Sequence, residues 1–138
     1  MWLGNGEGAD ERHRRGGAYF SRAVIPLLLE AAKARDEFPP TLIFTGATAA
    51  MKGGAQLASF ASGKFAMRAI AQSLGREYGP KGIHVVHAII DGIIDIEKSK
   101  GFMEEKEEAK ISPDAVSHII PEVDWGELNE EMRFMKIG

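Results

Sequence analysis

The sequence predicts an α/β fold built on parallel strands, and three segments carry that prediction. Two apolar segments, Thr41–Phe44 and Ile83–Ile90, have the composition of strands that are buried on both faces of a sheet. Between them, from about Leu57 to Tyr78, apolar residues recur at the spacing of a helix with one buried face, and Gly79-Pro80 ends that helix. A strand, a helix and a second strand of these lengths favour parallel pairing through a right-handed crossover.

A further helix is expected ahead of the first strand, over residues 18–35. Its apolar residues repeat at three and four positions, which gives one face for packing. Pro26 lies inside this segment and removes one backbone donor, so we expect a local bend there. The proline pair at 39–40 prevents the helix from continuing.

The two ends of the chain differ in composition from this centre, and we divide the chain accordingly. Residues 1–17 are glycine-rich and charged, and we interpret them as a disordered arm. Residues 18–120 form the predicted domain, and residues 121–138 are an acidic tail to which we assign no structure. Within the domain, Ser112 and Pro113 have the residue types of an N-cap and a first helical position, so a short helix is expected to begin there.

Two charged or glycine-rich segments need a separate interpretation. Gly4, Gly6 and Gly8 have the spacing of a phosphate-binding loop, but that loop requires a buried strand before it, which the first three residues do not provide. The run from Glu104 to Lys110 is interpreted as the solvated face of a helix. Neither segment therefore predicts a binding site.

The composition excludes several classes of function. The chain has 138 residues, a hydrophobic fraction of 44% and a net charge of −3, so it is globular and has no basic excess for binding nucleic acid. It has no cysteine, which excludes disulfides and thiolate metal sites and fits a cytoplasmic location. No apolar run has the length of a membrane span, and the charged N-terminal residues do not fit a signal peptide.

The segment from Thr41 to Gly92 resembles the second half of a short-chain dehydrogenase/reductase. Members of that family carry a Tyr-x-x-x-Lys motif at the start of the corresponding helix, and this chain has Phe60-Ala61-Ser62-Gly63-Lys64 there. The connector from Gly79 to Ile83 also matches the family. The resemblance extends over about residues 18–96, with a weaker match at 112–120. It implies a partial Rossmann-type, doubly wound parallel sheet that lacks the N-terminal, cofactor-binding half of the family fold.

The resemblance also assigns site residues, and it carries over in part. Lys64 matches the family lysine, which holds the nicotinamide ribose and tunes the catalytic tyrosine. The family tyrosine is replaced by Phe60, and the family serine falls at about Ala47, where the neighbouring Thr48 can supply a hydroxyl that orients a carbonyl. The supporting asparagine falls near Arg14 and is not matched.

On the cofactor side, the resemblance places Gly92 and Ile94 where backbone atoms of the family contact the nicotinamide. Asp91 and Asp95, beside them, fit either the rim of a site or solvated loop acids. His84 and His87 are three apart on a strand and so point to opposite faces, which disfavours a metal pair. We therefore predict no metal site.

The resemblance implies an NAD- or NADP-dependent oxidoreductase that acts on a small-molecule carbonyl or alcohol. Because the phosphate-binding half and the tyrosine are lacking, we expect this chain alone to be inactive and to bind neither dinucleotide appreciably. The alternatives are a non-catalytic fragment that forms homo-oligomers through helices 18–35 and 57–78, and a truncated gene product without selected function. Truncation is also expected to leave the first strand with an unpaired edge.

Overall fold

The computed structural model describes residues 7–34, 38–97, 110–117 and 134–137. Their elements follow one another in the order α1 (Glu7–Ala32), β1 (Thr41–Ala47), η1 (Thr48–Ala50), α2 (Ala58–Tyr78), η2 (Gly79–Lys81), β2 (His84–Ile90), β3 (Ile93–Ile94), β4 (Lys110–Ile111), α3 (Pro113–Ser117) and β5 (Phe134–Ile137). The expected strand–helix–strand unit is therefore present, and α2 and β2 begin within a residue of the predicted positions.

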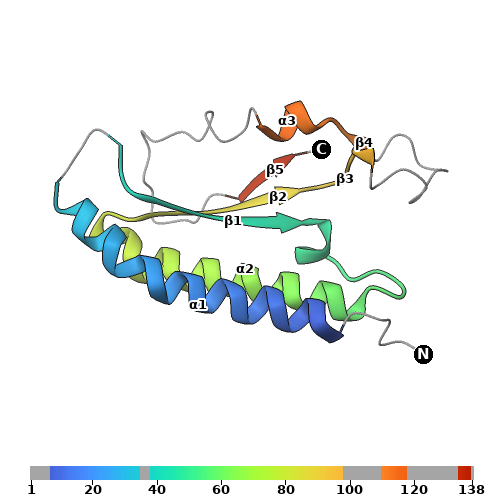
Figure 1. Ribbon diagram of the computed structural model, residues 1–138, viewed down its shortest axis with the longest axis horizontal. Helices are drawn as coiled ribbons and strands as arrows, with labels where there is room; N and C mark the ends of the chain where they lie inside the picture. Colours follow the sequence, from blue (N-terminus) through green and yellow to red (C-terminus); the bar gives the residue numbers. More distant parts are fainter. Residues whose placement is uncertain (1–6, 35–37, 98–109, 118–133, 138) are drawn as a thin grey trace.

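Parallel pairing organises the strands into two sheets. The larger is three-stranded with the order β1-β2-β5, and both of its strand pairs are parallel. The smaller consists of β3 and β4, again in parallel. Helices α1 and α2 run side by side beneath the larger sheet (Figure 1). This arrangement confirms the predicted α/β class with parallel strands.

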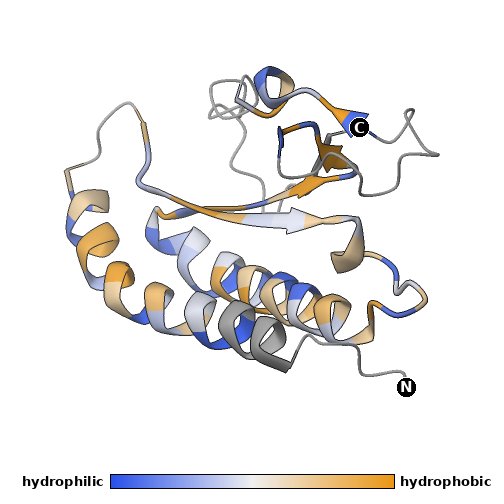
Figure 2. Cartoon of the chain, turned by 45° about the vertical axis from the view of Figure 1, so that its right-hand side comes forward, coloured by the Kyte–Doolittle hydropathy of each residue, from blue (hydrophilic) through white to orange (hydrophobic). Residues whose placement is uncertain are grey.

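The core lies between the helix pair and the larger sheet. Leu42 and Phe44 on β1 are each 4% exposed, and they cluster with buried residues of α2 and β2. Where Figure 2 colours them, both helices alternate hydrophobic and hydrophilic residues, as elements with one buried face must. The helical residues packed on this cluster are Val24, Leu28, Leu29, Met67, Ile70, Leu74 and Tyr78.

Burial of β1 corrects one prediction. We expected Thr41–Phe44 to be buried on both faces, but Ile43 is 36% exposed and Thr45 is exposed, whereas Leu42 and Phe44 between them are buried. The strand also continues three residues further than predicted, to Ala47. Alternating burial of this kind means that the helices cover one face of β1 and that the described residues leave its other face partly open.

The predicted disordered arm is wrong for residues 7–17. Helix α1 begins at Glu7 and runs unbroken through Pro26 to Ala32. Residues 7–15 include alanine, glutamate and arginine, which are strong helix formers. Gly17 lies where an added Cβ atom would be 3.7 Å from both Met67 and Phe44, so α1 passes close to α2 and β1 at this residue. The helix therefore continues from this contact towards Glu7, through a segment whose composition suggested disorder.

The C-terminal tail contains a strand that the sequence did not reveal. Phe134–Ile137 form β5, which pairs in parallel with β2 from His87 to Ile90. Four residues are too few to show a strand pattern, and the pairing follows from the position of β2. The predicted start of α3 is confirmed, because the Ala115 amide donates to the Ser112 hydroxyl over 3.1 Å. Residues 98–109 and 118–133, and with them most of the charged run, lie outside the described part.

The turn after α2 uses a different glycine from the one expected. Gly79 remains helical, with φ −53° and ψ −50°, and the short η2 turn follows it. Gly82 is the residue with a left-handed backbone, at φ 88°, and its amide donates to the Gly79 carbonyl oxygen over 2.9 Å. The amide of Ile83 donates to the Tyr78 carbonyl oxygen over 3.2 Å. Gly82 therefore redirects the chain from helix to strand.

We expect Gly82→Ala to lower the free energy of unfolding by about 1–2 kcal/mol, because alanine is strained at positive φ. Gly79→Ala is the matched control: its backbone is helical and an added Cβ atom would meet nothing within 4 Å. That change is expected to be neutral or to stabilise by about 0.4–1 kcal/mol. Urea denaturation of both variants measures the difference, and equal effects would contradict the assignment of the turn to Gly82.

Candidate functional site

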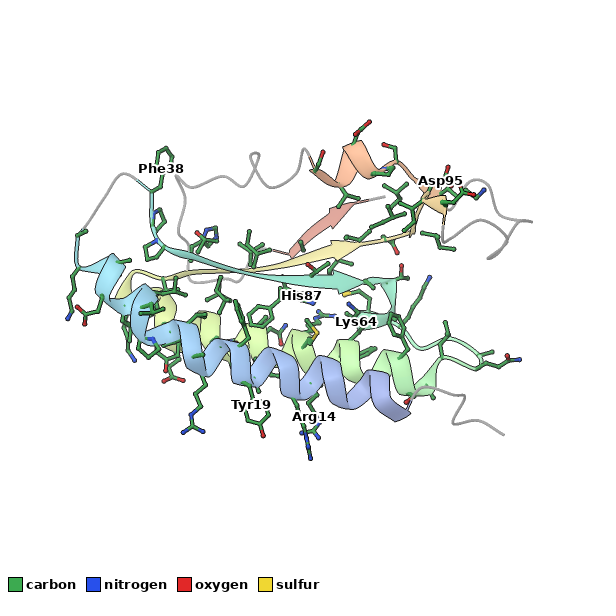
Figure 3. The ribbon with its side chains drawn as sticks, in the orientation of Figure 1. Arg14, Tyr19, Phe38, Lys64, His87 and Asp95 are labelled. Atoms are coloured by element: carbon green, nitrogen blue, oxygen red, sulfur yellow. The ribbon has the colours of Figure 1, made fainter. Side chains whose placement is uncertain are left out.

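Lys64 is a buried lysine at the sheet-facing side of α2. Its side chain is 9% exposed, and Nζ donates a hydrogen bond to the carbonyl oxygen of Thr45 over 3.1 Å. Figure 3 shows it between α2 and the sheet. Burial lowers the pKa of Lys64 below its ordinary value of 10.5. A solvated lysine on a helix surface is thus excluded, and the ammonium group is positioned at the end of β1.

Phe60 precedes Lys64 by one helical turn, so both lie on the same face of α2. The Lys64 Nζ atom is 5.8 Å from the centre of the Phe60 ring, which is within range of a cation–π contact. The Phe60 side chain is half-buried. It has no ionisable proton, so this pair retains a cation and a ring but no acid.

Thr48 and Asp91 meet at the carboxyl ends of β1 and β2. The register pairs Ala47 with Ile90, so the residue that follows each strand lies opposite the other. The Thr48 hydroxyl donates to Oδ1 of Asp91 over 2.6 Å, although the two residues are 43 positions apart in the chain. Both are half-buried. The structure therefore brings one predicted site residue, Thr48, together with an acid that the sequence left unassigned.

The turn that carries Thr48 is held by α2. The amides of Met51 and Lys52 donate to the Thr48 carbonyl oxygen over 2.9 and 3.1 Å, which closes the η1 turn. Nη1 of Arg68 donates to the Ala50 carbonyl oxygen over 3.3 Å. Lys64 and Arg68, one turn apart on α2, thus contact the end of β1 and the turn after it.

The predicted cofactor-side residues lie directly after β2. Gly92 and Ile94 are half-buried, and Ile94 pairs with Ile111 in the small sheet of β3 and β4. Asp95 is exposed, and its amide donates to the Ile111 carbonyl oxygen over 2.9 Å. The small sheet therefore fixes the backbone at Gly92 and Ile94 beside Asp91, and their contact with a nicotinamide stays a prediction.

His87 is buried in the structure, whereas the sequence analysis considered it only as an unlikely metal ligand. It is fully buried, and Figure 3 shows it near Lys64, between the sheet and α2. A Cβ atom on Gly46 would lie 2.6 Å from Cε1 of His87, closer than carbon atoms approach one another, so the ring requires glycine at that position. Side chains two residues apart on a strand lie on the same face, so His87 shares a face with the core residue Val85. This alternation could have shown from the sequence that His87 is buried.

Burial, together with the smaller effect of the positive charges of Arg68 and Lys64, lowers the pKa of His87 from 6.5 to about 4. The imidazole is therefore neutral at neutral pH. Among the described residues no three metal-ligating side chains come together, so the structure offers no metal cluster there. In the same described ranges no helix is long and apolar enough to cross a membrane.

Arg14 does not belong to this site. It is exposed on α1, and Figure 3 shows its side chain pointing away from the sheet. Lys64 contacts the end of β1 through Thr45, and Thr48 bonds to Asp91 just after the same strand. His87 lies near Lys64 (Figure 3), and Gly92 follows Asp91 in the chain.

Solved structures share this arrangement of strands and helices. A short-chain dehydrogenase from Rhodopseudomonas palustris is 30% identical, with a TM-score of 0.66, and the match covers 94% of this chain and 49% of that one. By fold, the chain corresponds to about half of a short-chain dehydrogenase/reductase. Neither a protein-family model nor a curated protein sequence matches it.

Two further dehydrogenase structures show the same half-fold. A short chain dehydrogenase from Shigella flexneri, complexed with NADP, has a TM-score of 0.70 at 18% identity, covering 92% of this chain and 50% of that one. A 3-oxoacyl-[acyl-carrier protein] reductase from Brucella melitensis has a TM-score of 0.71 at 18% identity, covering 91% and 48%. The chain thus spans about half the length of the dehydrogenases it matches.

The lowered pKa of His87 predicts a pH-dependent loss of stability. The unfolded imidazole binds a proton near pH 6.5, whereas the folded one does so only near pH 4, so the unfolded state binds more protons in this window. The stability is therefore complete above pH 6.5 and falls as the pH drops towards 4, by up to about 3 kcal/mol from His87.

Denaturant melts between pH 7 and 4 measure this loss in the wild-type chain and in His87→Gln. Carboxylates titrate over the same range in both proteins, so the difference between the two curves isolates the histidine. The variant is expected to lose less stability on acidification, and parallel curves would contradict the prediction.

Proposed function

We propose that the chain supplies the substrate-side half of a nicotinamide-dependent oxidoreductase site that acts on a carbonyl or a secondary alcohol. The observation that carries this proposal is the buried position of Lys64 at the carboxyl end of β1, with Nζ 3.1 Å from the Thr45 carbonyl oxygen. Burial of a lysine is unfavourable unless its charge is used or compensated. The solved dehydrogenase structures that match over this half of the fold support the same reading.

The donors of Lys64 fit the ribose end of a dinucleotide. An ammonium group has three N–H donors, and the Thr45 carbonyl oxygen accepts one of them. The remaining donors suit a vicinal diol such as that of a ribose. The backbone of Gly92 and Ile94 follows the carboxyl end of β2, where it can contact the nicotinamide. A bound dinucleotide would supply the hydride, and Lys64 would hold its ribose.

The pyrophosphate end has no counterpart in the described residues. Phosphates of a dinucleotide are bound where a strand passes through a glycine turn into a helix. Ahead of β1 the described residues form α1, with no strand before it. We therefore propose that the chain alone has negligible affinity for NAD or NADP and is inactive, and that it works together with a dinucleotide-binding half.

The edge of β1 is where such a half would join. Among the described strands, β1 pairs with β2 alone, so its other edge carries backbone groups available for pairing. Ile43 and Thr45 are exposed on the sheet face opposite the helices. A second layer of structure could pack on these two side chains. A parallel strand added at this edge would extend the sheet and pair with the backbone groups of β1.

Isothermal titration with NAD⁺, NADH, NADP⁺ and NADPH tests the cofactor proposal. We expect no heat of binding with this chain, and binding once the first half of a related reductase is fused ahead of Met1. In the fusion, Lys64→Met is expected to weaken binding about tenfold through loss of a charge-assisted hydrogen bond.

Lys33→Met is the matched control, because Lys33 is exposed just after the end of α1, where it pairs with Glu30. It is expected to leave affinity unchanged. Micromolar binding by the unfused chain would overturn the proposed need for a second half, and equal effects of the two lysine changes would remove Lys64 from the site.

A second candidate function is self-association through the helix pair. The observation that favours it is a set of exposed apolar residues on the outer side of the helices: Tyr19 is 65%, Phe20 59%, Leu27 70% and Phe65 42% exposed. Phe20 and Leu27 are seven residues apart, so they lie on one stripe of α1. Tyr19 points away from the sheet in Figure 3. We propose this stripe as the contact between two copies of the chain.

Sedimentation of Phe20→Glu/Leu27→Glu tests the self-association. The two charges are expected to shift any dimer towards monomer, because an apolar contact would have to bury them. Phe38→Glu is the control, since Phe38 is 62% exposed but lies outside both helices. An unchanged dimer in the double variant would place the contact elsewhere.

A further inference from the structure

The hydrogen bond between Thr48 and Asp91 determines what Thr48 can offer to a ligand. The Thr48 hydroxyl is the donor and Oδ1 of Asp91 the acceptor, over 2.6 Å. Oxygen–oxygen distances this short are typical of hydrogen bonds to an ionised carboxylate. Both side chains are half-buried, so the pair is formed within the fold and remains in reach of a small molecule.

Because the Thr48 hydroxyl donates to Asp91, Thr48 can only accept a hydrogen bond from a ligand. An ionised carboxylate accepts hydrogen bonds and donates none, whereas a threonine hydroxyl has a single hydrogen and two lone pairs. Because that hydrogen is directed at Asp91, a ligand that approaches the Thr48 oxygen meets lone pairs. A carbonyl oxygen would be repelled there, and a hydroxyl group would donate to it.

We propose that the Thr48–Asp91 pair makes this site selective for an alcohol over the corresponding carbonyl compound. This inference rests on the proposed function and names the form of the substrate that the chain binds. It also revises the role first considered for Thr48, which was to orient a carbonyl by donating to it. Asp91 is a specificity residue that acts through Thr48.

The position of the pair supports a role in binding. Thr48 and Asp91 follow two paired strands at their carboxyl ends, which is where parallel α/β sheets bind ligands. The Thr48 backbone is fixed by the η1 turn, whose closing bonds come from Met51 and Lys52. Lys64 contacts the same strand end through Thr45. The hydroxyl acceptor is thus held on a rigid turn, on the same strand end as the buried cation.

Titration of the full chain with cyclohexanol and cyclohexanone tests the inference. The two compounds have nearly the same shape and differ at the oxygen. With the threonine methyl and aspartate carboxyl carbons labelled for NMR, cyclohexanol is expected to shift the Thr48 and Asp91 signals at a concentration about tenfold lower than cyclohexanone. No dinucleotide is present, so failure here is separate from failure of the cofactor proposal.

Substitutions at Thr48 and Asp91 test whether these two residues cause the preference for the alcohol. Asp91→Asn is expected to reduce the preference for the alcohol, because its amide can donate to Thr48 and so release the threonine hydrogen towards a ketone. Asp95→Asn is the matched control, an exposed acid that is expected to leave the preference intact. Thr48→Ser should retain the preference and Thr48→Val should lose it. Equal shifts with both compounds, or no shift of Thr48 and Asp91 with either, would overturn the inference.

Discussion

The parallel register of β1 and β2 is the constraint on which the rest of this structure depends. The pairing of Thr41 with His84 at one end and Ala47 with Ile90 at the other places three features at once. It sets the core residues of both strands against the helices, it brings His87 against Gly46, and it makes Thr48 and Asp91 neighbours. A slip of one residue would turn the buried side chains to the opposite face and separate the polar pair.

Polar groups gather at one end of an otherwise apolar layer, and their charges interact. Lys64 and Arg68 both reach from α2 towards the end of β1. Burial is the main cause of the lowered pKa of His87, and the charges of these two residues lower it in the same direction. A neutral His87 avoids a second buried positive charge beside Lys64. Asp91 supplies a carboxylate at the same end of the sheet. Polar and ionisable groups held this way at strand ends are typical of binding sites, because the fold must stabilise them against the cost of burial.

The helices cover one face of the larger sheet, and this accounts for the uneven burial of its strands. On β1 the buried and exposed residues alternate, whereas four consecutive residues of β2, from His84 to His87, are buried. A strand with one open face and one open edge is incomplete as a unit of an α/β fold. The matched dehydrogenases are about twice as long as this chain, so their folds include elements beyond those described here.

The sequence alone determined the strand–helix–strand unit, the parallel sheet, the likeness to a dehydrogenase half and the position of Lys64 one turn after Phe60. These features follow from local periodicity and from a short motif, which a chain displays without reference to distant residues. The extent of α1, the strand β5, the alternating burial of β1 and the bond between Thr48 and Asp91 were decided by the tertiary structure. Each of them depends on residues far apart in the chain: Gly17 passes close to Met67, β5 pairs with β2, and the Thr48–Asp91 bond joins residues 43 positions apart. Periodicity carries no information on such contacts, because they arise from the packing of complete elements and from the register between strands.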